Sequence, residues 1–342
     1  MLHSPARRVL LVGGVAAAML ASSGTSAFAA APTGLTHTEF VAAMAAVRTA
    51  TAASEASGWR QESTITLAGM SVTGVVSYDP SSGRVSETAA GLFGLEATFA
   101  ERGTGTWSAV AHDPDSVAAQ KLLGKPAATY LLTPSWAGEI ASVVSQAASS
   151  QVTEEIAGVD TAIKTTQDDG TILYSLAVLD PSVNPPAVGG PPAVAFNLDI
   201  HTTAENVVIG QTITASDPTY GTTISATQTD SYGAQQITLP AASDTVTSAD
   251  VRRALNAIHL PQIVHDTASR VAQAAATLAR HAHRPISAGD VVLAAKQVVA
   301  GAPVRISVTR IKGGVRLSSV NPFTHRTVSN SVVVELAAVV HA

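Results

Sequence analysis

The sequence predicts an α+β protein in two parts: a long antiparallel sheet that carries helices, then a small basic α+β domain. Three observations predict it: segment patterns in the order helix, strands, helices, strands; short turn signals between the strands; and a charge reversal near residue 244. Only 13% of the 342 residues are charged, against roughly 25% in ordinary soluble domains, which excludes a charge-rich disordered chain. The length suggests about two domains.

Residues 1–29 have the features of a secretory signal peptide. Arg7 and Arg8 precede an apolar run, Val9 to Leu20, and Ala27-Phe28-Ala29 forms an A-x-A cleavage pattern. The run is too short to cross a bilayer, which needs about 20 residues. We therefore expect an exported chain, secreted or held in the cell envelope; an uncleaved membrane anchor is the alternative.

The chain has no cysteine. A lipidated N-terminus of the lipobox type needs a cysteine, so we expect no lipid anchor. Disulfides, thiolate catalysis and cysteine-ligated metals are excluded for the same reason.

Charge places the main domain boundary between residues 244 and 245. Residues 30–244 hold seven basic and 21 acidic residues, a net charge of −14, whereas residues 245–342 hold 11 basic and four acidic residues, a net charge of +7. Either the two parts dock on one another, or the basic part faces an anionic envelope polymer, anionic lipid headgroups or an acidic protein partner.

The first domain, residues 33–244, opens with a helix and continues as strands. Thr36-x-x-Glu39 is a capping box, and Phe40, Val41, Met44 and Val47 recur at helical spacing. Strands joined by turns at 79–83 and 102–105 are predicted at 62–67, 72–78, 95–101 and 106–110. The short connections predict an antiparallel sheet.

Two helices interrupt this sheet. Asp113 or Asp115 is expected to cap a short helix through Leu123, and Thr133-Pro134 to begin a longer one. Further strands are predicted at 162–166, 171–178, 193–202, 207–215, 222–229 and 235–240. Asp169-Gly170 marks a hairpin, and the proline-rich segment 180–192 is expected to be a loop.

Residues of about 35 to 245 resemble the lipoprotein-carrier (LolA-like) superfamily, in particular its envelope lipid-binding lipoproteins. The resemblance is carried by the opening helix and by loose patterns at Val76–Pro80, Glu154–Asp160, Phe196–Ile200 and Asp230–Pro240. It implies a strongly curved antiparallel half-barrel sheet covered by helices, with an apolar cavity between them. The missing lipobox cysteine and the extra C-terminal residues depart from that family.

Such a cavity would bind an acyl chain, since each buried CH₂ contributes about 0.8 kcal/mol. The residues expected to line it are Phe40, Met44, Leu67, Leu95, Phe99, Trp107, Trp136, Ile140, Phe196, Leu198 and Ile200. For each of them, a place in an ordinary hydrophobic core is the alternative.

The second domain, residues 245–342, is predicted to contain three helices and a small sheet. The helices are expected at 248–258, 261–283 and 287–301, the last with a Ser287-x-x-Asp290 capping box. Strands are expected at 304–309, 315–320 and 326–336, with a hairpin at Lys312-Gly313-Gly314.

Catalytic and metal-binding motifs are missing from the sequence. G-x-S-x-G, S-x-x-K, H-E-x-x-H and P-loop patterns do not occur. His281 and His283 point about 200° apart on a helix, so we expect surface histidines and no metal site. With 4% aromatic residues to stack on bases, nucleic-acid binding is not expected.

The sequence therefore predicts an exported, non-catalytic protein without a cofactor, which holds a lipid or other apolar ligand as a carrier or chaperone. Two alternatives stay open. One is an envelope-stress regulator whose C-terminal domain binds an anti-sigma factor or another protein; the other is a wall-associated protein whose own side chains fill the cavity.

Overall fold

The computed structural model describes residues 31–67, 69–91, 94–134, 137–154, 161–179, 195–217 and 222–335. The predicted signal peptide, the whole segment 180–192 and Trp136 lie outside these ranges. The chain divides into two compact units. Unit 1 is Met1–Ala109 with Pro134–Pro240, and unit 2 is Val110–Thr133 with Ala241–Ala342. Unit 2 thus includes residues 110–133, which precede the boundary expected from charge.

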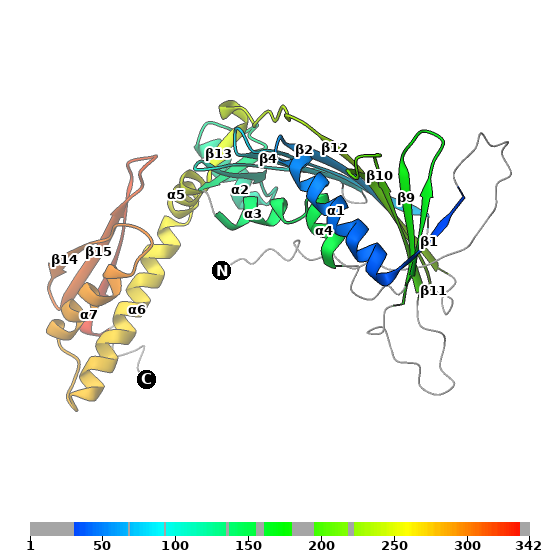
Figure 1. Ribbon diagram of the computed structural model, residues 1–342. Coiled ribbons are helices and arrows are strands. Elements are labelled where there is room, and N and C mark those ends of the chain that lie inside the picture. Colours follow the sequence, from blue (N-terminus) through cyan, green and yellow to red (C-terminus); the bar gives the residue numbers. More distant parts are fainter. Residues whose placement is uncertain are drawn as a thin grey trace. The chain divides into compact units, whose positions relative to one another are not determined.

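Unit 1 is built on a large, open antiparallel sheet (Figure 1). Its strands follow the order β1-β8-β9-β10-β11-β12-β2-β3-β4-β5-β6. Their bounds are β1 Thr33–Thr36, β2 Trp59–Leu67, β3 Met70–Asp79, β4 Arg84–Gly91, β5 Gly94–Glu101, β6 Gly105–Ala109, β8 Thr161–Thr166, β9 Ile172–Leu179, β10 Ala195–Thr202, β11 Val208–Asp217 and β12 Thr222–Tyr232. The predicted α+β class and antiparallel sheet are confirmed.

Helices cover part of one face of this sheet. Figure 1 shows α1 (His37–Glu55), α3 (Ala137–Val144) and α4 (Ala148–Glu154) on the same side of it. The predicted capping box starts α1: the Thr36 hydroxyl accepts from the Glu39 backbone N–H, and the Glu39 carboxylate accepts from that of Thr36.

Two hydrophobic clusters fix these helices to the sheet. In the first, Phe40, Met44 and Val47 of α1 pack with side chains of α4 and of β8 to β11, including Tyr174 and Leu198. In the second, Val143 and Ala147 pack against Trp59, Val85 and Ala100. The sheet is therefore anchored by helices at two separate places.

The predicted turns form as their residues require. The Asp79 carboxylate accepts from the Ser81 N–H and from the hydroxyls of Ser81 and Ser82, which closes the β3–β4 turn. Gly170 occupies the left-handed region at φ 84° between β8 and β9. Asp113 caps α2 (Pro114–Leu122) by accepting from the Ser116 N–H.

Several sequence predictions are wrong in detail. Thr133-Pro134 does not start a helix: both residues belong to β7 (Tyr130–Pro134), and the helices that follow are the two short ones, α3 and α4. Residues 235–240 form no strand. Strands β1 and β4 were not predicted. The sequence of β4 is rich in Ser, Thr, Ala and Gly and lacks a run of branched side chains, so it does not resemble a typical strand.

Unit 2 has its own core. Its remaining elements are β13 (Thr245–Thr247), which pairs parallel to β7, α5 (Ser248–Ile258), α6 (Leu260–His281), α7 (Ala288–Ala300), β14 (Ser307–Ile311), β15 (Gly314–Val320) and β16 (Thr327–Val333), with a short 3₁₀ turn at Ala242–Asp244. The last three strands form an antiparallel sheet that packs against α6 and α7. Val264, Val271 and Ala275 of α6 are fully buried there, as their helical spacing predicts.

No helix among the described residues combines the length and the hydropathy needed to cross a membrane.

At Gly58, between α1 and β2, the backbone lies very close to the backbone of Gly233. The φ of Gly58 is 114°, its carbonyl accepts from the Gly233 N–H, and a Cβ built on it would lie 2.6 Å from the Gly233 carbonyl oxygen. We expect Gly58→Ala to destabilise unit 1 by about 2–4 kcal/mol, through the left-handed backbone and the clash together. Urea unfolding followed by tryptophan fluorescence measures this, because the tryptophans of the chain all lie in unit 1.

The matched control for this prediction is Gly103→Ala. Gly103 has φ 82° but nothing within 4 Å of its added Cβ, so only the backbone cost of about 1 kcal/mol is expected. Equal losses in the two variants would contradict the close approach at Gly58.

Candidate ligand-binding face

Between the two helix anchors, the middle of the sheet carries a surface of aliphatic side chains. We call it the open apolar face and define it as Ile65, Leu67, Met70, Val72, Ile213, Ile224 and Ala226. The register joins these residues across four neighbouring strands, with Leu67 opposite both Met70 and Ile224, and Ile65 opposite both Val72 and Ala226. Ala226 in turn pairs with Ile213 of β11.

This surface lies on the helix side of the sheet. Directly paired residues share a face, and Ile213 is paired with Leu198, which is buried under α1. Ile213 itself packs against that core. The pairs from Ile213 to Ala226, Ile65 and Val72, and from Ile224 to Leu67 and Met70, place the remaining residues on the same side. This side of the sheet therefore extends from the core under α1 to the exposed residues where β2 and β3 meet.

The uncovered part is substantially exposed. Leu67 is 44% exposed, Met70 48% and Val72 39%, while Ile65, Ile224 and Ala226 are half-buried. Single exposed aliphatic side chains are common on protein surfaces, but neighbouring ones on adjacent strands form a patch that needs an explanation.

The opposite face of the same strands has a different chemistry. The residues that alternate with the open apolar face are Thr64, Thr66, Ser71, Thr73, Thr212, Thr214, Ser225 and Thr227. The hydroxyl groups of these side chains can form hydrogen bonds with water on that side. The sheet therefore separates a polar side from an aliphatic side even where none of the described helices covers either side.

A polar cluster borders the open apolar face on the same side of the sheet. We call it the glutamine cluster and define it as Gln61, Gln211, Gln228 and Asp230. Gln211 pairs with Gln228, and Gln61 with Asp230, so the four side chains share one face. On the same side of the sheet, the next residue after Gln211 on β11 is Ile213, and the residue before Gln228 on β12 is Ala226. The polar cluster is therefore directly adjacent to the open apolar face.

Three of these four residues are buried, and hydrogen bonds hold Asp230 in place. Gln61 Nε2 donates to Asp230 Oδ1 at 3.3 Å, and Gln228 Nε2 lies 3.2 and 3.1 Å from Oδ1 and Oδ2. Gln61 Nε2 also lies 3.4 Å from the Gln146 carbonyl, in the link between α3 and α4. Gln211 is 6% exposed, and within the described part of the chain its Nε2 has no hydrogen-bond partner.

Burial raises the pKa of Asp230 to about 6, since Asp230 is only 8% exposed and desolvation disfavours its charged form. The donors on Gln228 and Gln61 oppose this shift, and the negative charge of Glu55 adds to it. Burial, with Asp230 and Glu55, also raises the pKa of Tyr232, whose hydroxyl donates to the Val208 carbonyl at 2.7 Å. The cluster is thus a region of negative potential.

The residues predicted to line a cavity lie in different places. Phe40, Met44, Leu198 and Ile200 are fully buried in the first core cluster, and Ile140 packs on the second. Leu67 belongs to the open apolar face. For these residues, the lining of a cavity stays a prediction.

Phe99 and Trp107 pair with each other on the face opposite to Val85 and Ala100, the face that α3 does not touch. Leu95 lies in β5 and Phe196 in β10, but their side chains, like Trp136, lie outside the described part of the structure. Met70, Val72 and the glutamine cluster were not predicted from the sequence. The alternation Gln61, Ser63, Ile65, Leu67 was the signal that could have found them.

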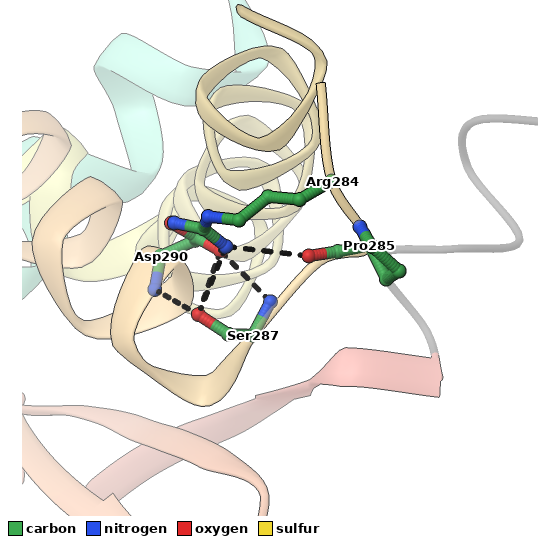
Figure 2. Close-up of polar contacts among 4 residues, drawn as sticks. All are labelled: Arg284, Pro285, Ser287 and Asp290. Carbon is green, nitrogen blue, oxygen red and sulfur yellow. Dashed lines mark hydrogen bonds and ion pairs between the residues drawn. The ribbon is translucent and has the colours of Figure 1, made fainter. Parts of the chain in front are cut away.

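Unit 2 has a shallow hollow of about 320 Å³ at the C-terminal end of α6, lined by Ala276, Ala279, Arg280, Arg284, Pro285, Ile286 and Val334. Figure 2 shows that Arg284 turns to Asp290. Its Nη1 and Nη2 donate to the two carboxylate oxygens at 2.7 Å each, while Ser287 donates to Oδ2 through its N–H and hydroxyl. This guanidinium therefore holds the carboxylate of Asp290, which with Ser287 forms the capping box of α7.

The histidines of unit 2 do not gather. His259 lies 2.8 Å from an Asp115 carboxylate oxygen, and His265 lies near Asn330. Among the described residues, no three side chains of His, Cys, Asp or Glu come together as a metal site would require.

No protein-family model matches this sequence, and no characterised protein matches it either. The resemblance to lipoprotein carriers therefore stays an expectation of the sequence.

The raised pKa of Asp230 predicts how the stability of unit 1 changes with pH. The folded state holds the proton more tightly than the unfolded chain, so stability falls as pH rises from about 3.8 to about 6 and then stays level. The loss is of the order of 3 kcal/mol. Asp230→Asn is expected to remove it, which urea unfolding by tryptophan fluorescence at pH about 4 and about 7 measures.

The pH dependence of stability must be compared between the wild type and Asp230→Asn, because other carboxyl groups make unit 1 more stable as pH rises. Asp79 and Glu101, for example, have lowered pKa values from their hydroxyl and Arg84 donors, and they stabilise the fold as pH rises. If the difference between wild type and Asp230→Asn did not depend on pH, Asp230 would not be a buried acid.

In unit 2, Asp290→Ala removes both the Arg284 pair and the α7 cap. Arg284, then Ser287, hold the pKa of Asp290 well below its usual range, so its contribution is present above pH 3.8 and is lost on acidification below it. We expect a loss of about 1–3 kcal/mol at neutral pH, measured by far-ultraviolet circular dichroism. Asp266→Ala, which changes an exposed carboxylate on α6, is the control and is expected to cost less than about 0.5 kcal/mol.

Proposed function

We propose that unit 1 binds a lipid or another amphiphilic molecule on its open apolar face, without catalysis. The observation that carries this proposal is the contrast between the two sides of the four strands β11, β12, β2 and β3: hydroxyl residues on one side and exposed aliphatic residues on the helix side. A sheet that needed only solubility would place polar side chains on both uncovered sides.

Energetics favours an apolar occupant. Leu67, Met70 and Val72 are between 39% and 48% exposed, so a hydrocarbon chain laid across them removes apolar area from water on both partners. Each CH₂ that leaves water contributes about 0.8 kcal/mol before the costs of ordering are subtracted. An acyl chain is long enough to follow the ladder over several strands, which are about 4.8 Å apart.

The fold supports such a role because its helices do not cover the whole sheet. The α1–α4 core and the α3 cluster leave the ends of β2 and β3 outside both hydrophobic clusters. A curved half-barrel, as the sequence resemblance implies, would turn this face into a cavity. With a signal-like N-terminus, the chain would act as a carrier or chaperone of envelope lipids outside the cytoplasm.

A matched pair of charged substitutions tests the proposal. Val72→Glu puts a carboxylate on the open apolar face, whereas Thr73→Glu puts one on the opposite face at the next residue of β3. Both sites are exposed, so both variants are expected to fold. The measurement is the fluorescence titration of N-phenyl-1-naphthylamine, an uncharged apolar probe, into each purified full-length chain.

We expect Val72→Glu to weaken probe binding roughly tenfold or more, because a charge must be desolvated against the apolar ligand, and Thr73→Glu to leave binding unchanged. Equal affinities in the two variants, or no probe binding by the wild type, would reject the open apolar face as a ligand site.

A further inference from the structure

The glutamine cluster and the open apolar face together describe an amphiphilic site. On β11, Gln211 is followed on the same side by Ile213, and on β12 Gln228 is preceded by Ala226. Residues two apart on a strand are about 6.6 Å apart, a span that the first few carbon atoms of an extended acyl chain cover. A molecule whose tail lies on the open apolar face therefore brings its polar group to the glutamine cluster.

Gln211 carries a buried hydrogen-bond donor that a ligand could satisfy. Its side chain is buried and its Nε2 has no hydrogen-bond partner among the described residues, although a buried donor without an acceptor costs about 1–3 kcal/mol. Gln211 lies directly opposite Gln228 on the same face of the sheet, and Gln228 is half-buried. An acceptor oxygen bound on this face, over the two strands and with the Gln211 amide turned toward it, would satisfy Nε2.

The charges of the cluster select the kind of acceptor. The interactions described for the Asp230 carboxylate come from Gln61, Gln228 and Glu55, none of which is a cation. Glu55, at the end of α1, is held by the N–H and hydroxyl of Ser149 and adds negative potential. An anionic headgroup would meet two carboxylates here without a compensating positive charge, so it would be repelled.

We infer that the ligand of unit 1 is an amphiphile with an uncharged polar group, such as the hydroxyl or ester of an acylglycerol, whose oxygen accepts a hydrogen bond from Gln211 Nε2. This inference rests on the proposed function and adds the substrate class: neutral lipids are bound in preference to anionic ones of the same chain. Gln211 fixes the polar group, and the open apolar face binds the tail.

The experiment compares two ligands with the same hydrocarbon chain, 1-monooleoylglycerol and oleate, as competitors for N-phenyl-1-naphthylamine on the full-length chain. At pH about 8, both Asp230 and oleate are ionised. We expect monooleoylglycerol to bind at least about tenfold more tightly than oleate, because the carboxylate of oleate must be desolvated next to Asp230. Oleate binding as tightly as monooleoylglycerol, or more tightly, would overturn the inference.

Two variants locate the effect in the cluster. Gln211→Met keeps the length of the side chain and removes its donor, so we expect about three- to tenfold weaker binding of monooleoylglycerol, after correction for the affinity of the variant for the probe. Gln273→Met, at an exposed position on α6, is the matched control and is expected to change neither affinity. Asp230→Asn removes the negative charge and should raise the affinity for oleate.

The outcomes separate the two claims. If the probe does not bind to the wild type, the proposed function fails and the inference fails with it. If the probe binds but Gln211→Met leaves monooleoylglycerol affinity unchanged, the open apolar face stands and the assignment of the polar group to Gln211 is wrong. If Gln211→Met unfolds, the wild-type preference between the two ligands still decides the substrate class.

Discussion

Successive side chains of a β-strand point to opposite faces, and this constraint governs unit 1. On β2 it separates Thr64 and Thr66 from Ile65 and Leu67, and the register then aligns each set with like residues on β3 and β12. A slip of one residue would turn the aliphatic set to the other side of the sheet. The hydrophobic clusters under α1 and α3 prevent such a slip, because Leu198 and Trp59 must stay buried.

The same constraint explains why a buried acid is tolerated. Asp230 shares its face with Trp59 and with the core residues on β11, so it cannot reach solvent on the hydroxyl side. The glutamines supply donors instead of a cation, which keeps the carboxylate in place but leaves its pKa raised. Asp290 shows the opposite arrangement in unit 2, where Arg284 and Ser287 stabilise the charged form. The two units thus handle a buried carboxylate in different ways.

Local patterns predicted the elements well where they carry their own chemistry. The capping boxes at Thr36 and Ser287, the Asp79 turn and the Asp169-Gly170 hairpin depend on contacts within a few residues. Predictions failed where a neighbour decides the outcome. Pro134 ends a strand, β7, which pairs with β13 more than a hundred residues later in the chain. The residues around Pro134 cannot indicate that pairing.

Large apolar side chains guided the prediction of the candidate site from the sequence. Phe40, Leu198 and Ile200 are buried in the hydrophobic cluster under α1, whereas Met70 and Val72, which were not predicted, are exposed. Size and hydropathy measure the tendency of a side chain to leave water, but they do not say whether protein or ligand covers it. The unpaired amide of Gln211 is equally invisible in the sequence, because glutamine at a strand position reads as a solvated residue.

The α+β class, the antiparallel sheet, the helix caps and the turns could be predicted from the sequence, since they follow from periodicity and from short-range hydrogen bonds. In contrast, the exposure of individual aliphatic residues and the meeting of Gln61, Gln211, Gln228 and Asp230 on one face depend on the fold. Strand pairing brings together residues as far apart as 61 and 230, and side-chain burial depends on where helices from other parts of the chain come to lie.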